Sequence, residues 1–86
     1  MIDPSKFTMR EMDYAGIRAY LKACPEITEY RLLIGFGSDK DGTLIYPLIS
    51  YDVMMSVIQS IPKGHKVQTL CADNMIVFVP DFQWEN

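Results

Sequence analysis

The chain has 86 residues, 49% of them hydrophobic, and a formal net charge of −3. This length allows one domain, and the apolar share is that of an ordinary globular protein, which argues against an intrinsically disordered chain. The mildly acidic net charge argues against non-specific binding to nucleic-acid phosphates, so we expect no direct contact with nucleic acid.

Residues 1–12 are predicted to be a leader outside the folded units. They lack the basic stretch followed by an apolar segment that marks a signal peptide. The longest apolar runs of the chain are too short to cross a bilayer, so we expect a soluble, cytoplasmic protein without membrane contact. Cys24 and Cys71 are expected to be buried free thiols, because nothing in the sequence indicates an oxidising compartment.

Two segments, residues 14–25 and 51–62, repeat one pattern. Each begins with a tyrosine behind a helix-capping residue, Asp13 or Ser50, and each ends with a proline. The pattern predicts two helices of similar length. On a helical wheel their apolar faces correspond pairwise: Tyr14, Gly16, Ile17, Tyr20, Leu21 and Cys24 against Tyr51, Val53, Met54, Val57, Ile58 and Ile61. Gly16 on this face is expected to permit close approach of a strand or of the other helix.

Four segments have the alternation or composition of strands: residues 28–36, 43–49, 65–72 and 75–79. Residues 37–42 are predicted to be a turn. Asp73 and Asn74 are predicted to form a two-residue hairpin turn of the kind that needs positive φ. Pro47 cannot donate to a ladder, so it confines its strand to a sheet edge or marks a bulge.

The order of elements predicts an α+β fold built from a duplicated αββ unit. The units would span residues 13–49 and 50–80, followed by a tail of residues 81–86. We expect a pseudo-two-fold relation, one four-stranded antiparallel sheet, and both helices packed on one face. Gly35, Arg31, Gln68, Leu33 and Leu70 would then lie on the other face. That face is too apolar to be freely solvated, and a partner or a second copy of the chain in a homodimer could cover it.

No motif carries a specific chemistry. The stretch around Gly42 resembles part of a calcium loop, but it lacks a carboxylate at one end and a bidentate glutamate at the other, so we expect a structural turn that binds no metal. Gly35 and Gly37 resemble a fragment of a phosphate loop without the helix that should follow it. His65 is the one histidine, and no spacing favours a nucleophile or a metal-ligand set for it. We therefore expect no cofactor.

Aromatic and acidic residues gather at the C-terminal end, where Val67 to Asn86 contain no lysine or arginine. This predicts a protein contact built from Asp73, Asp81, Phe82, Trp84 and Glu85, in which the aromatic rings supply affinity and the carboxylates suit a basic partner. The alternative is that Trp84 closes the core. The sheet face around Arg31 and Leu33 is the next candidate for the contact.

These observations favour a non-enzymatic protein-binding module, a small inhibitor or adaptor that occupies a partner's surface. Chains of this size and kind are often encoded by phages or mobile elements and act on host or defence machinery. The alternative is a small-ligand binder or small enzyme with a pocket between helices and sheet or at a dimer interface. Its polar lining would be Tyr14, Tyr20, Tyr51, Arg18 and His65.

Overall fold

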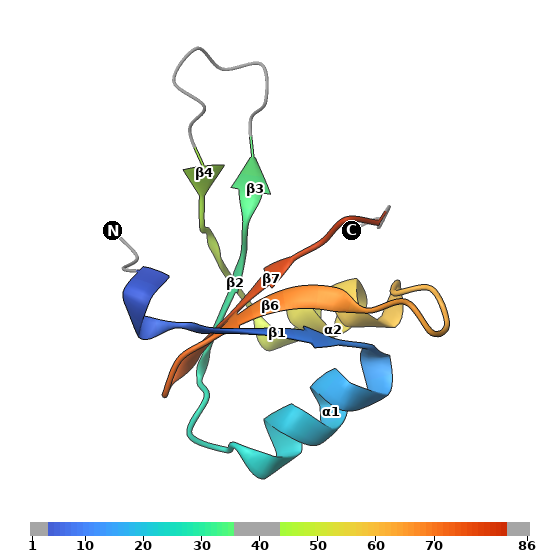
Figure 1. The fold of residues 1–86 in the computed structure, drawn as a ribbon, viewed down its shortest axis with the longest axis horizontal. Coiled ribbons are helices and arrows are strands. Elements are labelled where there is room, and N and C mark those ends of the chain that lie inside the picture. The colour runs from blue at the N-terminus through green and yellow to red at the C-terminus, as the bar shows by residue number, and fades with distance from the viewer. Residues whose placement is uncertain (1–3, 36–43, 83–86) are drawn as a thin grey trace.

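The computed structural model describes residues 4–35 and 44–82, which form a five-stranded mixed sheet, two helices and a small additional ladder (Figure 1). The elements in chain order are η1 (Pro4–Lys6), β1 (Thr8–Met12), α1 (Tyr14–Ala23), β2 (Glu29–Leu32), β3 (Ile34–Gly35), β4 (Leu44–Ile45), β5 (Leu48–Ile49), α2 (Tyr51–Gln59), β6 (Val67–Cys71) and β7 (Met75–Val79). The α+β class and the two helices are as predicted. No helix in the described ranges is long and apolar enough to span a membrane.

Both helices begin at the predicted capping residues. The Asp13 carboxylate accepts a hydrogen bond from the Gly16 amide at 2.8 Å, and the Ser50 hydroxyl accepts one from the Val53 amide at 3.1 Å. These bonds satisfy amides that have no partner within the first turn of a helix. The two helix starts predicted from the repeated pattern are therefore confirmed.

Gly16 permits close approach of a strand, one of the two expected neighbours, and this strand is β1, which directly precedes the helix. A Cβ atom at this position would lie 3.1 Å from the Asp13 carboxylate oxygen and 3.3 Å from the Met12 Cβ. The space that a side chain would fill is thus taken by the cap of the same helix and the end of β1. The glycine allows the chain to turn tightly from strand into helix.

The sheet has the order β1-β6-β7-β2-β5. The central strand β7 runs parallel to β2, while the other pairs are antiparallel. The predicted four-stranded antiparallel sheet is therefore wrong. The fifth strand is β1, which lies within the predicted leader of residues 1–12 and pairs along its whole length with β6. Its polar, exposed sequence is that of an edge strand, where charged side chains discourage further pairing.

The topology contains a repeat, but its unit is βαβ and not αββ. The pairings make β1 parallel to β2 and β5 parallel to β6, so each helix connects two parallel strands. Exchanging β1 with β5 and β2 with β6 about the central β7 maps one unit onto the other. A two-fold between αββ units would instead place equivalent strands of the two units side by side at the centre. The neighbours there are β7 and β2, which are the second strand of one unit and the first strand of the other. Both helices pack into one core on the same face of the sheet, as two crossovers of the usual right hand require.

Two predicted strands are each interrupted. The segment 28–36 divides into β2 and β3 at Leu33, and the segment 43–49 divides into β4 and β5 at Tyr46 and Pro47. β3 and β4 pair with each other and project away from the main sheet (Figure 1). β5 is an edge strand, as Pro47 predicted. The predicted turn of residues 37–42, with its resemblance to a calcium loop, lies outside the described residues.

The hairpin between β6 and β7 closes without the predicted positive φ. In the described chain only Gly64 has a positive φ, and Asp73 and Asn74 do not. The Ala72 amide donates to the Met75 carbonyl at 2.9 Å, which closes the turn. The Asn74 carbonyl then accepts from the amides of Thr28 and Glu29, so this turn also fixes the entry to β2.

The core lies between the two helices and the sheet face that they cover. Its fully buried members from the helices are Ile17, Met54, Val57 and Ile58. They pack with sheet residues that include Leu32, Ile76 and Phe78. Both cysteines are free, as expected, although only Cys71 is buried and Cys24 is partly exposed. Tyr51 departs from the predicted apolar face, because 55% of it is exposed.

Candidate functional site

One row of side chains crosses all five strands on the sheet face that carries no helix. The strand registers place it as Met9, Leu70, Val77, Arg31 and Leu48, each directly opposite the next. Since neighbouring strands are about 4.8 Å apart, the row is about 19 Å long. Four of its five members are apolar, although this face has no helix above it.

The exposure of this row rises from its centre to its two ends. Val77 on the central strand is fully buried, whereas Met9 and Leu48 on the two edge strands are 54% and 61% exposed. In the described chain they are two of the three large hydrophobic residues that are exposed, the third being Tyr51. Folding of this chain therefore leaves both ends of the row available to another surface.

Arg31 is held in place on this face by its neighbours. Its Nη1 donates to the Tyr46 carbonyl at 2.6 Å, and its Nε lies 3.3 Å from a carboxylate oxygen of Glu29. Leu33, just beyond β2, extends the ladder by donating from its amide to the Phe78 carbonyl at 2.8 Å. Arg31 thus lies on the helix-free face that the sequence predicted for it.

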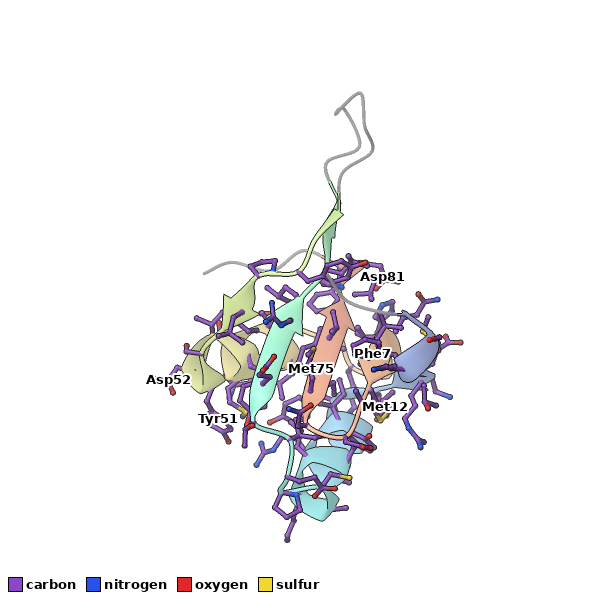
Figure 2. All side chains as sticks on the ribbon, turned by 90° about the vertical axis from the view of Figure 1, so that its left-hand side faces the viewer. Phe7, Met12, Tyr51, Asp52, Met75 and Asp81 are labelled. Atoms are coloured by element: carbon purple, nitrogen blue, oxygen red, sulfur yellow. The ribbon has the colours of Figure 1, made fainter. Side chains whose placement is uncertain are left out.

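The acidic residues predicted to act with the C-terminal aromatics do not form one cluster. Asp73 lies in the turn before Met75, whereas Asp81 lies beyond the other end of β7 (Figure 2). A strand of five residues separates them by about 17 Å. Trp84 and Glu85 lie outside the described residues.

Asp81 and Phe82 instead contact the segment that leads into β6. An Asp81 carboxylate oxygen lies 2.7 Å from the His65 Nε2, and the Phe82 ring meets the His65 ring edge-on at 6.1 Å between centroids. Phe82 is partly buried and packs against the core. The hydrogen bond with His65 is the main cause that lowers the pKa of Asp81 below its usual value of 3.8.

We expect His65→Ala to raise the pKa of the Asp81 carboxyl toward its usual value, because the main stabiliser of the carboxylate is removed. A depressed carboxyl pKa contributes stability above the pKa of the unfolded chain and loses it as pH falls through the folded value. The stability difference between wild type and variant should therefore shrink below about pH 4. Carboxyl carbon shifts followed by NMR measure the pKa directly. An unchanged titration of Asp81 would contradict the assignment.

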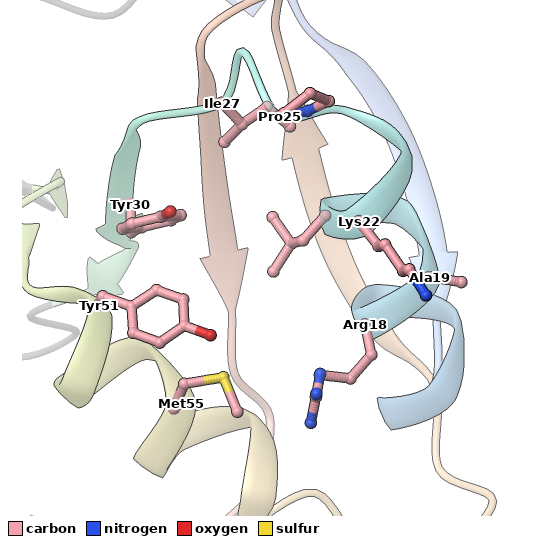
Figure 3. Close-up of a pocket in the computed structure, with 9 residues that line it drawn as sticks. Arg18, Ala19, Lys22, Pro25, Ile27, Tyr30, Tyr51 and Met55 are labelled. Carbon is pink, nitrogen blue, oxygen red and sulfur yellow. The ribbon is translucent and has the colours of Figure 1, made fainter.

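A groove of about 410 Å³ lies between α1 and α2 (Figure 3). Its lining residues are Arg18, Ala19, Leu21, Lys22, Pro25, Ile27, Tyr30, Tyr51 and Met55. Arg18 and Lys22 extend from α1, while Tyr51 and Met55 extend from α2 on the opposite wall. The rings of Tyr30 and Tyr51 meet edge-on, with 6.0 Å between their centroids.

The five residues predicted to line a ligand pocket are only partly brought together. Arg18 and Tyr51 face the groove of Figure 3, but Tyr14 lines a second hollow of about 540 Å³ at the start of α1. The Arg10 guanidinium lies over the Tyr20 ring, 5.3 Å from its centroid. Burial is the main cause that raises the pKa of the Tyr20 hydroxyl, and a hydrogen bond with Cys71 is the second. His65 lies with Asp81. The predictions missed Lys22, which the helical spacing of four residues from Arg18 could have indicated.

No protein-family model matches this chain, and neither a curated relative nor a solved structure matches it. Within the described residues, no group of three or more histidine, cysteine, aspartate or glutamate side chains could hold a metal ion. The exposed ends of the apolar row and the lining of the groove make the helix-free sheet face and the helix groove the two candidate sites, and they lie on different sides of the sheet.

Proposed function

We propose that the chain is a non-enzymatic protein-binding module, an inhibitor or adaptor, and that it binds its partner through the helix-free face of the sheet. The observation that carries this proposal is the row from Met9 to Leu48, an apolar stripe with both ends exposed. Large exposed hydrophobic side chains that share one face are typical of protein interfaces.

The partner is a protein with an apolar surface and a basic rim. Glu11 and Glu29 occupy strand positions on this face together with Arg31, so these three groups sum to −1, and the whole chain carries −3. Arg31 is engaged by Glu29 and by the Tyr46 carbonyl, so of these three groups the exposed Glu11 is the charge that is open to a partner. The apolar row would supply most of the affinity, and the charge would supply association rate and selectivity.

We expect the double variant Met9→Glu/Leu48→Glu to lose its protein partners while keeping its melting temperature. Both side chains are more than half exposed, so their replacement removes little buried surface. The matched control is Ala15→Glu/Gln59→Glu, which adds the same two charges to exposed positions on the helices. Affinity capture from cells of the source organism, quantified by mass spectrometry for all three proteins, measures the difference.

A partner retained by the helix control and lost by the sheet variant supports the proposal. A partner bound equally by both variants contradicts it. The C-terminal tail supplies a second comparison, because Phe82→Ala/Trp84→Ala tests the aromatic anchor predicted from the sequence. If this variant stays folded and alone loses the partner, the contact lies in the tail and not on the sheet.

A further inference from the structure

We propose that the groove between α1 and α2 binds a small, flat aromatic anion, meaning an aromatic ring that bears a phosphate or a carboxylate. The groove lies on the helical side of the sheet, so this site is separate from the face proposed for protein binding. Its volume of about 410 Å³ is within the range of small-molecule sites. The ligand class follows from the two walls of the groove.

The wall from α1 is cationic. Arg18 and Lys22 are four residues apart on the helix and both line the groove; the guanidinium points to the side of Tyr51, and the ammonium ends next to Ala19 (Figure 3). Arg18 donates from Nη1 to the Tyr14 hydroxyl at 2.7 Å, which positions the guanidinium and leaves its other donors available. Among the residues that the structure describes, no aspartate or glutamate lines the groove, and neither cation forms an ion pair with one. The groove carries +2 in a chain whose net charge is −3.

The wall from α2 is aromatic. Tyr51 is 55% exposed and belongs to the first turn of a helix whose buried residues are Met54, Val57 and Ile58. Tyr30 from β2 holds the Tyr51 ring edge-on from one side, and Met55 lies one helical turn further on. A flat ring can stack against an exposed tyrosine that is supported in this way.

The distribution of charge around the groove favours a ligand that carries both features. Glu26 and Asp52 follow the lining residues Pro25 and Tyr51 in sequence, but they are exposed and do not line the groove. An anionic group placed against Arg18 and Lys22 therefore meets no like charge on the lining. In Figure 3 the guanidinium and the Tyr51 ring lie on opposite sides of the groove, so one ligand could contact both.

The test uses the intact chain and two aromatic anions, AMP and 1-naphthyl phosphate. Titrations followed by amide NMR spectra and by calorimetry should show saturable binding, with the largest shifts at Arg18, Lys22 and Tyr51. Adenosine lacks the anion and inorganic phosphate lacks the ring, so each should bind at least about tenfold more weakly than AMP. If neither aromatic anion binds, or if phosphate binds as tightly as AMP, the proposal is overturned.

Three variants assign the binding to the groove. Arg18→Gln/Lys22→Gln and Tyr51→Ala should each weaken binding of the better probe about tenfold, through loss of the cations or of the stacking surface. The matched control is Lys66→Gln, which removes an exposed cation outside the groove. An equal loss in the control would show non-specific attraction and overturn the site. Unchanged melting temperatures exclude unfolding as the cause.

Discussion

Replacing Ile58 by alanine is expected to lower the free energy of unfolding by about 2–5 kcal/mol. Ile58 is fully buried in the last turn of α2 and belongs to the core between the helices and the sheet. Truncation removes apolar contacts and leaves a cavity that rigid neighbours cannot fill completely. Because total stability is about 5–15 kcal/mol for a typical domain, this single change could remove much of it. Urea unfolding followed by circular dichroism measures the loss.

The control is Leu21→Ala, at the corresponding position of α1. The repeated pattern predicts the same cost for both substitutions, but the structure separates them, because Leu21 is only partly buried and lines the open groove. We expect a loss of about 1 kcal/mol for Leu21, since little cavity forms beside an open groove. Equal losses in the two variants would show that the groove is closed in solution.

The helices could be predicted from the sequence because their signals are local. Asp13 and Ser50 cap through bonds to amides three residues further on, and the prolines that follow prevent either helix from continuing. The hairpin of β6 and β7 is also local in sequence, and its second strand has the predicted bounds. These elements need no information about distant parts of the chain.

β1 was missed because its sequence matches the start of a helix and lacks the pattern of a strand. The residues from Thr8 to Glu11 match a helix-capping pattern, and four of the five residues of β1 are exposed. An edge strand with few buried side chains has no strong alternation of polar and apolar residues. Its place is determined by pairing with β6, 59 residues further along the chain at Arg10 and Thr69, where the Thr69 hydroxyl donates to the Arg10 carbonyl at 3.0 Å.

The composition of β7 indicates a central strand, although the predicted four-stranded sheet did not take this into account. Residues 75–79 are a continuous apolar run, and Ile76, Val77 and Phe78 are all buried. Such a run is typical of a strand with neighbours on both sides and both faces covered, and it is common in parallel pairs. The alternation expected of a hairpin on an open face would have required a polar residue at Val77.

The two candidate sites could be predicted only in part, since each depends on residues from several elements. The apolar excess on the helix-free face was evident from Leu33 and Leu70, but the row needs Met9 from the missed strand. In the groove, Arg18 and Tyr51 were named, but their shared pocket depends on how α1 and α2 lie across the sheet. Which residues meet in each site depends on the register between strands and on the placement of the helices, and local sequence patterns do not contain this information.

Replacing Val77 by aspartate is expected to destabilise the domain by about 3–5 kcal/mol or to unfold it. Val77 is fully buried at the centre of the row, between Leu70 and Arg31. Arg31 is engaged by Glu29 and the Tyr46 carbonyl, so it offers little compensation to a new carboxylate. Urea unfolding at pH 7 measures the change. Leu48→Asp in the same row is the control, and we expect it within about 0.5 kcal/mol of wild type because Leu48 is 61% exposed.

The pH dependence distinguishes burial of a charge from loss of packing. Desolvation raises the pKa of a carboxyl at position 77 in the folded state above its value in the unfolded chain. The folded protein then binds a proton at higher pH than the unfolded one, so the destabilisation of Val77→Asp should diminish as pH falls from 7 toward about 4. A destabilisation that is independent of pH would mean that water reaches this position. In that case the helix-free face would be open along its whole length, and its centre as well as its ends would be available to a partner.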